Sequence, residues 1–127
     1  MNIAKKILIL EDEEIILDLL SKKLSGQGYE VKTARNGKEG MLMMEKEIPD
    51  LVLTDVIMPE KNGFDVISEM KQSETLKNVP VIIISNSGQP VEIDKAKELG
   101  VSDWVIKTEF DPNEIISKVN NILCQKF

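Results

Sequence analysis

Four short apolar runs and one alternating stretch divide this chain, and a segment with helical spacing follows each of them. The apolar runs cover residues 6–10, 51–54, 81–84 and 104–106, and residues 29–34 alternate between apolar and polar, as in an outer, half-exposed strand. The helical stretches cover about 13–25, 38–46, 64–72, 90–99 and the residues from 111 onward. Strands that alternate with helices over short connections predict an α/β fold, with helices on both faces of a parallel sheet. Right-handed crossovers then limit the topologies that this sheet can adopt.

The apolar positions of the expected helices repeat at a spacing that gives each helix one buried face. In the first helix they are Ile15, Ile16, Leu19, Leu20 and Leu24. In the last helix they are Ile115, Ile116, Val119, Ile122 and Leu123. The helix at 90–99 has few apolar positions and many charges, so we expect it to be the most mobile of the five.

Length and composition narrow the class of protein. The chain has 127 residues, so we expect one domain over residues 1–127 and no output domain. A formal net charge of −6 argues against direct nucleic-acid or anionic-membrane binding. The chain has no histidine, which excludes Ser–His and Cys–His catalysis and His-ligated zinc. Cys124 is the only cysteine, so no internal disulfide can form and a reducing, cytoplasmic location is expected. No apolar run is long enough for a signal peptide or a membrane span.

The stretch over residues 51–59 places a carboxylate at the end of a strand. Residues 51–53 are apolar in succession, as in a strand that is covered on both faces. Pro59 disfavours helix at Met58, so the chain must turn there. Asp55 therefore lies at the carboxyl end of a central strand, where open α/β sheets bind ligands. Taken alone, such an Asp is more often a turn or capping residue, so the other strand ends decide its role.

Polar residues follow four of the five expected strands. Glu11 and Asp12 follow the first, Asp55 the third, Ser85 the fourth and Lys107 the fifth. All strands of a parallel sheet point the same way, so these residues should meet at one rim. Close carboxylates repel one another, by roughly 4 kcal/mol for a pair 4 Å apart at an effective dielectric near 20. A divalent cation relieves this repulsion, and oxygen ligands without His or Cys suit Mg²⁺.

The same rim suits phosphoryl transfer. An Asp carboxylate can attack phosphorus and form an aspartyl phosphate. A metal ion, the Lys107 amine and the Ser85 hydroxyl can neutralise or hydrogen-bond the oxygens of the transferring group.

The chain resembles the CheY-like receiver domains of two-component response regulators over essentially its whole length. The motifs that carry the resemblance are the acidic pair after the first strand and the sequence Asp-x-x-Met-Pro-x-x-x-Gly from Asp55 to Gly63. Ser85 lies thirty positions after Asp55, and Lys107 follows twenty-two positions later. The resemblance implies a flavodoxin-like (βα)₅ three-layer sandwich whose five-stranded parallel sheet has the strand order 2-1-3-4-5.

The resemblance also implies a phosphorylation site. Asp55 would accept a phosphoryl group from a histidine kinase or a histidine phosphotransfer protein in a Mg²⁺-dependent reaction, with Mn²⁺ as a possible substitute. Asp12 and Asp55 would bind the metal directly, and Glu11 would bind it through water. The backbone carbonyl of Ile57 would complete the protein ligands.

The remaining expected site residues serve the phosphoryl group and the switch. Lys107 would contact the phosphate and Ser85 would supply the switch hydroxyl. Trp104, three positions before the lysine, would be the switch aromatic. Asn86 and Met58 would line the site. The helix at 90–99, the fifth strand and the last helix would form the face that signals to a downstream protein or to a missing output domain, as a monomer or as a phosphorylation-dependent homodimer.

Two positions, Thr108 and Asn86, depart from the family pattern. Asn86 follows the switch Ser85, where a smaller residue is common, and its amide would partly cover the phosphate site or hydrogen-bond there. Thr108 stands where the family lysine is normally followed by proline, and a cis bond before a non-proline residue costs about 2.5–4 kcal/mol, so we expect a trans bond. Ile57 is apolar where some members carry an amide or acid that orients the attacking water. We therefore expect slow self-dephosphorylation and no other enzymatic activity.

Three alternative functions stay open. A Mg²⁺-dependent phosphatase with an Asp nucleophile would share this site, but such enzymes usually have a second Asp where Ile57 stands. A receiver-like interaction module that is never phosphorylated would not need the Asp, the acidic pair and the lysine together. A flavodoxin-like FMN protein would need a phosphate-binding loop after the first strand, where the acids at 11–14 would repel phosphate.

Overall fold

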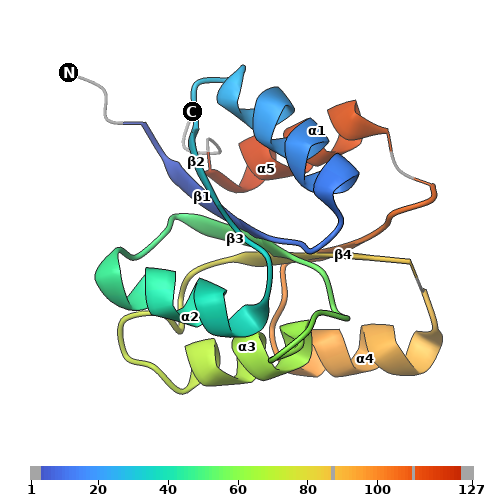
Figure 1. Cartoon of the computed structure of the whole chain (residues 1–127). Helices are drawn as coiled ribbons and strands as arrows, with labels where there is room; N and C mark the ends of the chain where they lie inside the picture. The colour runs from blue at the N-terminus through green and yellow to red at the C-terminus, as the bar shows by residue number, and fades with distance from the viewer. Residues whose placement is uncertain (1–3, 87, 110, 124–127) are drawn as a thin grey trace.

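Strands and helices alternate along the chain as the sequence predicts (Figure 1). The computed structural model describes residues 4–86, 88–109 and 111–123. The strands are β1 (Lys6–Leu10), β2 (Glu30–Ala34), β3 (Leu51–Thr54), β4 (Val81–Ser85) and β5 (Asp103–Ile106). The helices are α1 (Glu14–Ser25), α2 (Gly37–Lys46), α3 (Gly63–Lys71), α4 (Pro90–Glu98) and α5 (Pro112–Leu123). The expected boundaries and the observed ones agree closely, because β1, β3, β4 and β5 are apolar runs that stop at a polar or turn-forming residue, and β2 is the alternating, largely exposed edge strand.

The five strands form one parallel sheet with the order β2-β1-β3-β4-β5, which confirms the predicted topology. β1 lies between β2 and β3, so that Ile7 pairs with Val31 on one side and with Leu51 on the other. β3 and β4 continue the sheet to the β5 edge. This order places the ends of β1, β3, β4 and β5 next to one another, and these are the four ends that carry polar residues.

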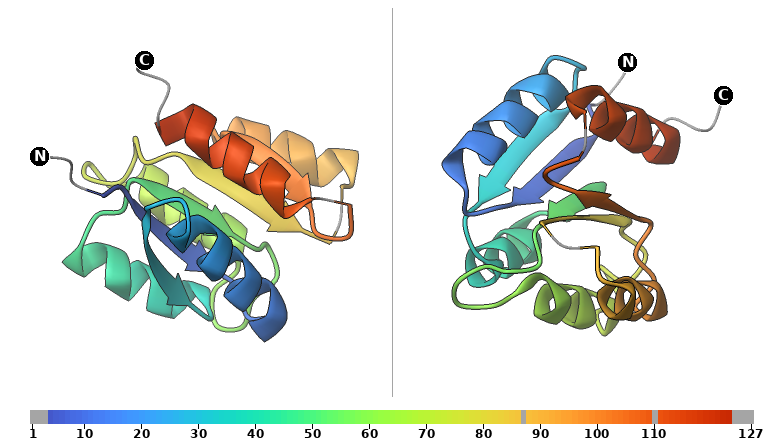
Figure 2. Two further views of the ribbon diagram at one scale, coloured as in Figure 1. Left: turned by 90° about the horizontal axis from the view of Figure 1, so that it is seen from above. Right: turned by 90° about the vertical axis from the view of Figure 1, so that its right-hand side faces the viewer.

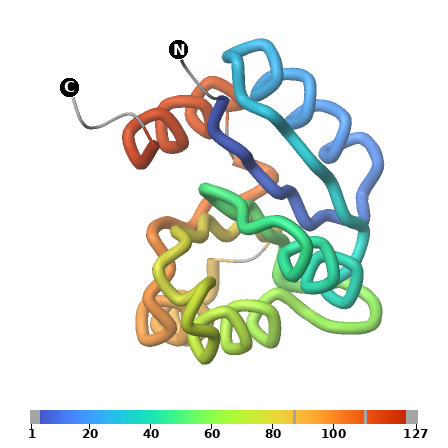
Figure 3. Tube along the Cα trace, turned by 90° about the vertical axis from the view of Figure 1, so that its left-hand side faces the viewer, coloured from blue at the N-terminus to red at the C-terminus, as the bar shows by residue number. Residues whose placement is uncertain are grey.

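Helices cover both faces of the sheet, with α1 and α5 on one face and α2, α3 and α4 on the other (Figures 1 and 2). Alternate strand residues supply the two cores. Ile7 and Ile9 of β1 face the α1–α5 side, whereas Leu8 and Leu10 face the α2–α4 side. The Cα trace viewed from the amino ends of the strands shows the same three layers (Figure 3). No helix in the described residues is long and apolar enough to cross a membrane.

The buried face of α1 differs from the expected one. Leu17, Leu20 and Leu24 are buried, whereas Ile15 is almost fully exposed. The helix begins only at Glu14, so Ile15 lies in its first turn, on the side away from the sheet. The expectation for Ile15 was wrong because spacing alone does not fix which of several adjacent apolar residues faces the core.

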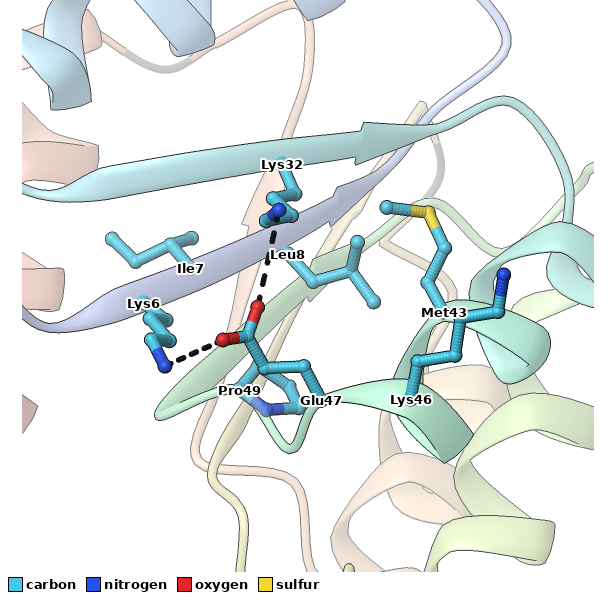
Figure 4. Close-up of a pocket in the computed structure, with 8 residues that line it drawn as sticks. All are labelled: Lys6, Ile7, Leu8, Lys32, Met43, Lys46, Glu47 and Pro49. Carbon is cyan, nitrogen blue, oxygen red and sulfur yellow. Dashed lines mark hydrogen bonds and ion pairs between the residues drawn. The ribbon is translucent and has the colours of Figure 1, made fainter.

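A pocket of about 130 Å³ lies beside β1, β2 and the end of α2 (Figure 4). Leu8 and Met43 supply apolar lining, and three lysines surround them. Glu47 lies between two of these lysines, with its carboxylate 2.6 Å from Lys6 Nζ and 3.9 Å from Lys32 Nζ. We call this region the α2–β1 pocket, and none of the expected site residues lies in it.

Candidate functional site

The carboxyl ends of the strands bring the expected polar residues together. Glu11, Asp55, Ser85 and Lys107 are all buried, although each has a polar side chain, and Asp12 is exposed. Polar groups are rarely buried without compensating contacts. Contacts within the group account for the burial of Glu11, Asp55 and Lys107.

Asp55 is held by its own loop and by β1. Its backbone N–H donates to Leu10 O at 3.0 Å, which extends the pairing of β3 with β1. Its Oδ1 accepts from the Val56 N–H at 2.7 Å, and its Oδ2 accepts from Lys107 Nζ at 2.8 Å. The glycine of the motif, Gly63, donates its N–H to Val56 O at 2.8 Å. A Cβ at this glycine would lie 2.2 Å from Asp55 O, so any other residue would displace the backbone that carries Asp55.

Lys107 joins three carboxylates at the rim. Its Nζ lies 2.9 Å from Glu11 Oε2 and 2.8 Å from Asp55 Oδ2, and it also contacts Glu13 Oε2. Burial alone would lower the pKa of Lys107, but its hydrogen bonds to Asp55, Glu13 and Glu11 outweigh burial and raise the pKa above its usual value. The Lys107 side chain is therefore a cation held in a fixed position. The backbone N–H of Lys107 donates to Ser85 O at 2.7 Å, where β4 and β5 end together.

Glu13 is a site residue that the sequence reasoning missed. Glu13 directly precedes the first helix, where an acid favours the helix dipole whether or not it belongs to a site. The structure places its backbone N–H 3.0 Å from Glu11 Oε2 and its carboxylate against Lys107. Its position directly after the acidic pair, where α1 begins beside the rim, is the signal that could have revealed it.

The carboxylates at the rim fit a divalent cation. Glu11, Asp12 and Asp55 each offer an oxygen, and these oxygens lie within 4.8 Å of one another. Glu11 Oε1 is buried and has no hydrogen-bond partner among the described residues. Burial raises the pKa of Glu11, against the opposing effect of Lys107, because a buried carboxylate is poorly solvated. A hard cation such as Mg²⁺ would satisfy this oxygen and offset the repulsion between the carboxylates.

A cleft of about 280 Å³ opens over Asp55. We call it the Asp55 cleft, and its lining residues are Asp12, Glu13, Asp55, Val56, Ile57, Ser85, Asn86 and Glu92. Asn86 therefore lies where it was expected, and Ile57 exposes its side chain at the cleft margin. Met58 was expected to line the site, but it is buried in the core on the α2–α4 side and is not among the lining residues. The turn at Pro59 directs its side chain inward.

Glu92 is the second lining residue that the sequence did not reveal. It belongs to the first turn of α4, and its Oε1 is buried without a hydrogen-bond partner among the described residues. Only the folded arrangement brings this turn over the carboxyl end of β3.

Trp104 lies beside the core of the α2–α4 face. Its ring is half-buried, and the centroid is 6.4 Å from that of Phe64. Lys95 Nζ lies 4.7 Å from the Phe64 centroid, so α3, α4 and β5 meet around these rings. No peptide bond is cis within the described ranges, which confirms the trans bond expected between Lys107 and Thr108.

Comparison with known proteins agrees with this fold and identifies its family. The family model for the response regulator receiver domain matches residues 7–120. The chain is 36% identical over 122 residues to "Probable transcriptional regulator ycf27" of Pyropia yezoensis, an alignment that covers 96% of this chain and 49% of that protein. It is 34% identical over 117 residues to response regulator SaeR of Staphylococcus aureus (strain USA300), covering 92% of this chain and 50% of SaeR.

Two solved structures have the same fold. One is the phosphorylated cyanobacterial phytochrome response regulator RcpA, with 28% identity and a TM-score of 0.85 over 98% of this chain and 97% of RcpA. The other is the receiver domain of sensor histidine kinase PA1611 from Pseudomonas aeruginosa PAO1, which has a magnesium ion in its active-site cleft. It shares 21% identity and a TM-score of 0.84, over 94% of this chain and 97% of that one.

This chain belongs to the family of response regulator receiver domains. It spans about half the length of the curated relatives that it matches.

Proposed function

We propose that this receiver domain accepts a phosphoryl group on Asp55 from a phosphohistidine of a histidine kinase or a histidine phosphotransfer protein. One observation carries the proposal: the Asp55 carboxylate faces the cleft while Lys107 Nζ holds its Oδ2 at 2.8 Å. Family membership and the phosphorylated state of RcpA support it. The donor's histidine must come from a partner, because this chain has none.

The transfer forms one bond and breaks one. An Asp55 oxygen attacks phosphorus, and the bond from phosphorus to the donor's imidazole nitrogen breaks, with its electron pair returning to the ring. Lys107 holds Asp55 Oδ2 before the transfer and neutralises phosphoryl oxygens during it. The Ser85 hydroxyl, at the end of β4, hydrogen-bonds the transferred group.

Glu11, Asp12 and Asp55, with the Ile57 carbonyl, would hold Mg²⁺, and Mn²⁺ has the same ligand preference for oxygen. The ion, when bound, supplies positive charge next to the transferring oxygens. The magnesium-bound PA1611 receiver supports this assignment.

The output of the switch would be carried by α4, β5 and α5. Movement of Ser85 toward the phosphoryl group would free the Trp104 ring to change rotamer, and this would alter the face around α4. The recipient is a downstream protein or an output domain, and the phosphorylated form acts as a monomer or as a homodimer. We place the protein in the cytoplasm, with no direct binding to nucleic acid or membrane.

Self-dephosphorylation would be slow, because Ile57 offers no group that orients water at the cleft margin. Replacing Ile57 with Asn should shorten the half-life of the aspartyl phosphate, measured by intact mass after removal of the donor. An unchanged half-life would mean that another residue controls hydrolysis.

Incubation with acetyl phosphate and Mg²⁺, followed by intact mass spectrometry, tests the proposed function. We expect one phosphoryl adduct on the wild-type chain and none on Asp55→Asn. Steady release of phosphate from phosphate monoesters would instead indicate a phosphatase. The absence of an adduct with every donor would indicate an interaction module that is not phosphorylated.

A further inference from the structure

Among the described residues, Glu92 is the acid of the Asp55 cleft that belongs neither to the Lys107 cluster nor to the expected cation site. Its Oε1 is buried without a partner among the described residues, whereas Asp94 and Glu98 of the same helix are exposed. A first-turn acid favours the helix dipole from a solvated position, so the dipole does not require the buried orientation. An unpartnered buried oxygen costs free energy. The orientation of Glu92 therefore calls for a role in the cleft.

The charged groups around the Asp55 cleft indicate the role of Glu92. Lys107 contacts Glu11, Glu13 and Asp55, but no contact with Glu92 exists among the described residues. The cation site expected at the rim uses Glu11, Asp12 and Asp55, which again leaves Glu92 out. The Glu92 carboxylate is thus a negative charge on the wall of the cleft that neither positive centre of the site neutralises directly.

We propose that Glu92 is a specificity-determining residue that disfavours small anionic phosphodonors and thereby favours a phosphohistidine. This inference rests on the proposed function. A phosphohistidine that is protonated on its second ring nitrogen carries one net negative charge, and its ring leaves as neutral imidazole when the phosphorus–nitrogen bond breaks. Acetyl phosphate instead enters as a dianion and releases an acetate anion as its phosphorus–oxygen bond breaks. The Glu92 carboxylate repels the second kind of donor more strongly, because Coulomb repulsion grows with the charge of the incoming group.

The comparison of two small donors isolates this effect. Acetyl phosphate is dianionic at neutral pH, and phosphoramidate carries less negative charge and releases ammonia when its phosphorus–nitrogen bond breaks. Initial rates of adduct formation are measured by intact mass with Mg²⁺, for the wild-type chain and for Glu92→Gln and Glu92→Lys. Glu98→Gln is the matched control, since it removes the same charge from an exposed position of the same helix. Circular dichroism verifies that each variant is folded.

For Glu92→Gln we expect the ratio of the acetyl phosphate rate to the phosphoramidate rate to rise by roughly three- to tenfold. The ratio should rise further in Glu92→Lys, stay at the wild-type value in Glu98→Gln, and lose its sensitivity to residue 92 at high salt. A purely structural role of Glu92 would change both rates by the same factor and leave their ratio unchanged. An unchanged ratio in a folded Glu92→Gln variant would overturn this inference and leave the proposed function standing. A wild-type chain that neither donor phosphorylates would overturn the proposed function and the inference with it.

Discussion

Two lysine–carboxylate clusters lie at opposite ends of the sheet and differ mainly in burial. At the carboxyl end, the side chains of Lys107, Glu11 and Asp55 are 3%, 2% and 9% exposed. In the α2–β1 pocket, the side chains of Lys6 and Glu47 are 34% and 42% exposed (Figure 4). The nitrogen–oxygen distances are similar, at 2.8–2.9 Å for Lys107 and 2.6 Å for Lys6.

Burial determines what these similar contacts do. Water and salt screen Lys6 and Glu47, and their hydrogen bond raises the pKa of Lys6 and lowers that of Glu47, as for an ordinary surface pair. The Glu11 and Asp55 carboxylates beside Lys107 are buried away from water, so each depends on the amine or on a bound cation. The same chemical groups thus form a surface contact at one end of the sheet and a reactive site at the other.

Replacing each of the two lysines in turn should give the largest difference between the clusters. Lys107→Met should destabilise the chain by about 3–5 kcal/mol without metal, because it leaves Glu11 and Asp55 buried without their cation, and it should abolish labelling by acetyl phosphate. Lys6→Met should leave labelling unchanged and have little effect on urea unfolding. Equal losses of stability in the two variants would show that burial is not what distinguishes the clusters.

Addition of Mg²⁺ should stabilise only the carboxyl-end cluster. At 100 times its dissociation constant, Mg²⁺ should raise the free energy of unfolding by about 2.7 kcal/mol. The effect should be largely lost in Asp12→Asn, and Glu47→Gln in the α2–β1 pocket should keep it. Thermal unfolding with and without EDTA measures this, and a gain that survives in Asp12→Asn would place the ion elsewhere.

Glu13 should have an intermediate effect, because it contacts Lys107 while its side chain is 52% exposed. Glu13→Gln should change the free energy of unfolding by less than about 1 kcal/mol. It should remove one contact to Lys107 without abolishing labelling by acetyl phosphate. Urea unfolding and adduct formation test this. Complete loss of labelling would mean that Glu13 is as essential as the buried acids.

Salt should give the smallest effect and should separate the two clusters by how the stability of each lysine variant responds to ionic strength. Raising the ionic strength should remove the difference in urea midpoint between wild type and Lys6→Met. The deficit of Lys107→Met should persist in the same titration. A deficit of Lys107→Met that salt also removes would contradict the role given to burial.

The sequence predicted the sheet well and the side-chain directions less well. Continuous apolar runs mark buried parallel strands, and each ends at a polar residue, so the strands and the rim followed from the pattern alone. Ile15 was assigned to the wrong face of its helix, and Met58 to the site instead of the core. Glu13 and Glu92 depend on where α1 and α4 begin and on which way their first turns face, and only the folded chain determines these directions.

The most direct test of the site is to locate the phosphoryl group with and without metal. After reaction with acetyl phosphate, borohydride trapping and peptide mass spectrometry should find the modification at Asp55 with Mg²⁺ and almost none with EDTA. Modification of another residue, or equal modification of Asp55 in EDTA, would contradict a phosphoacceptor that depends on its buried acidic partners and a bound cation.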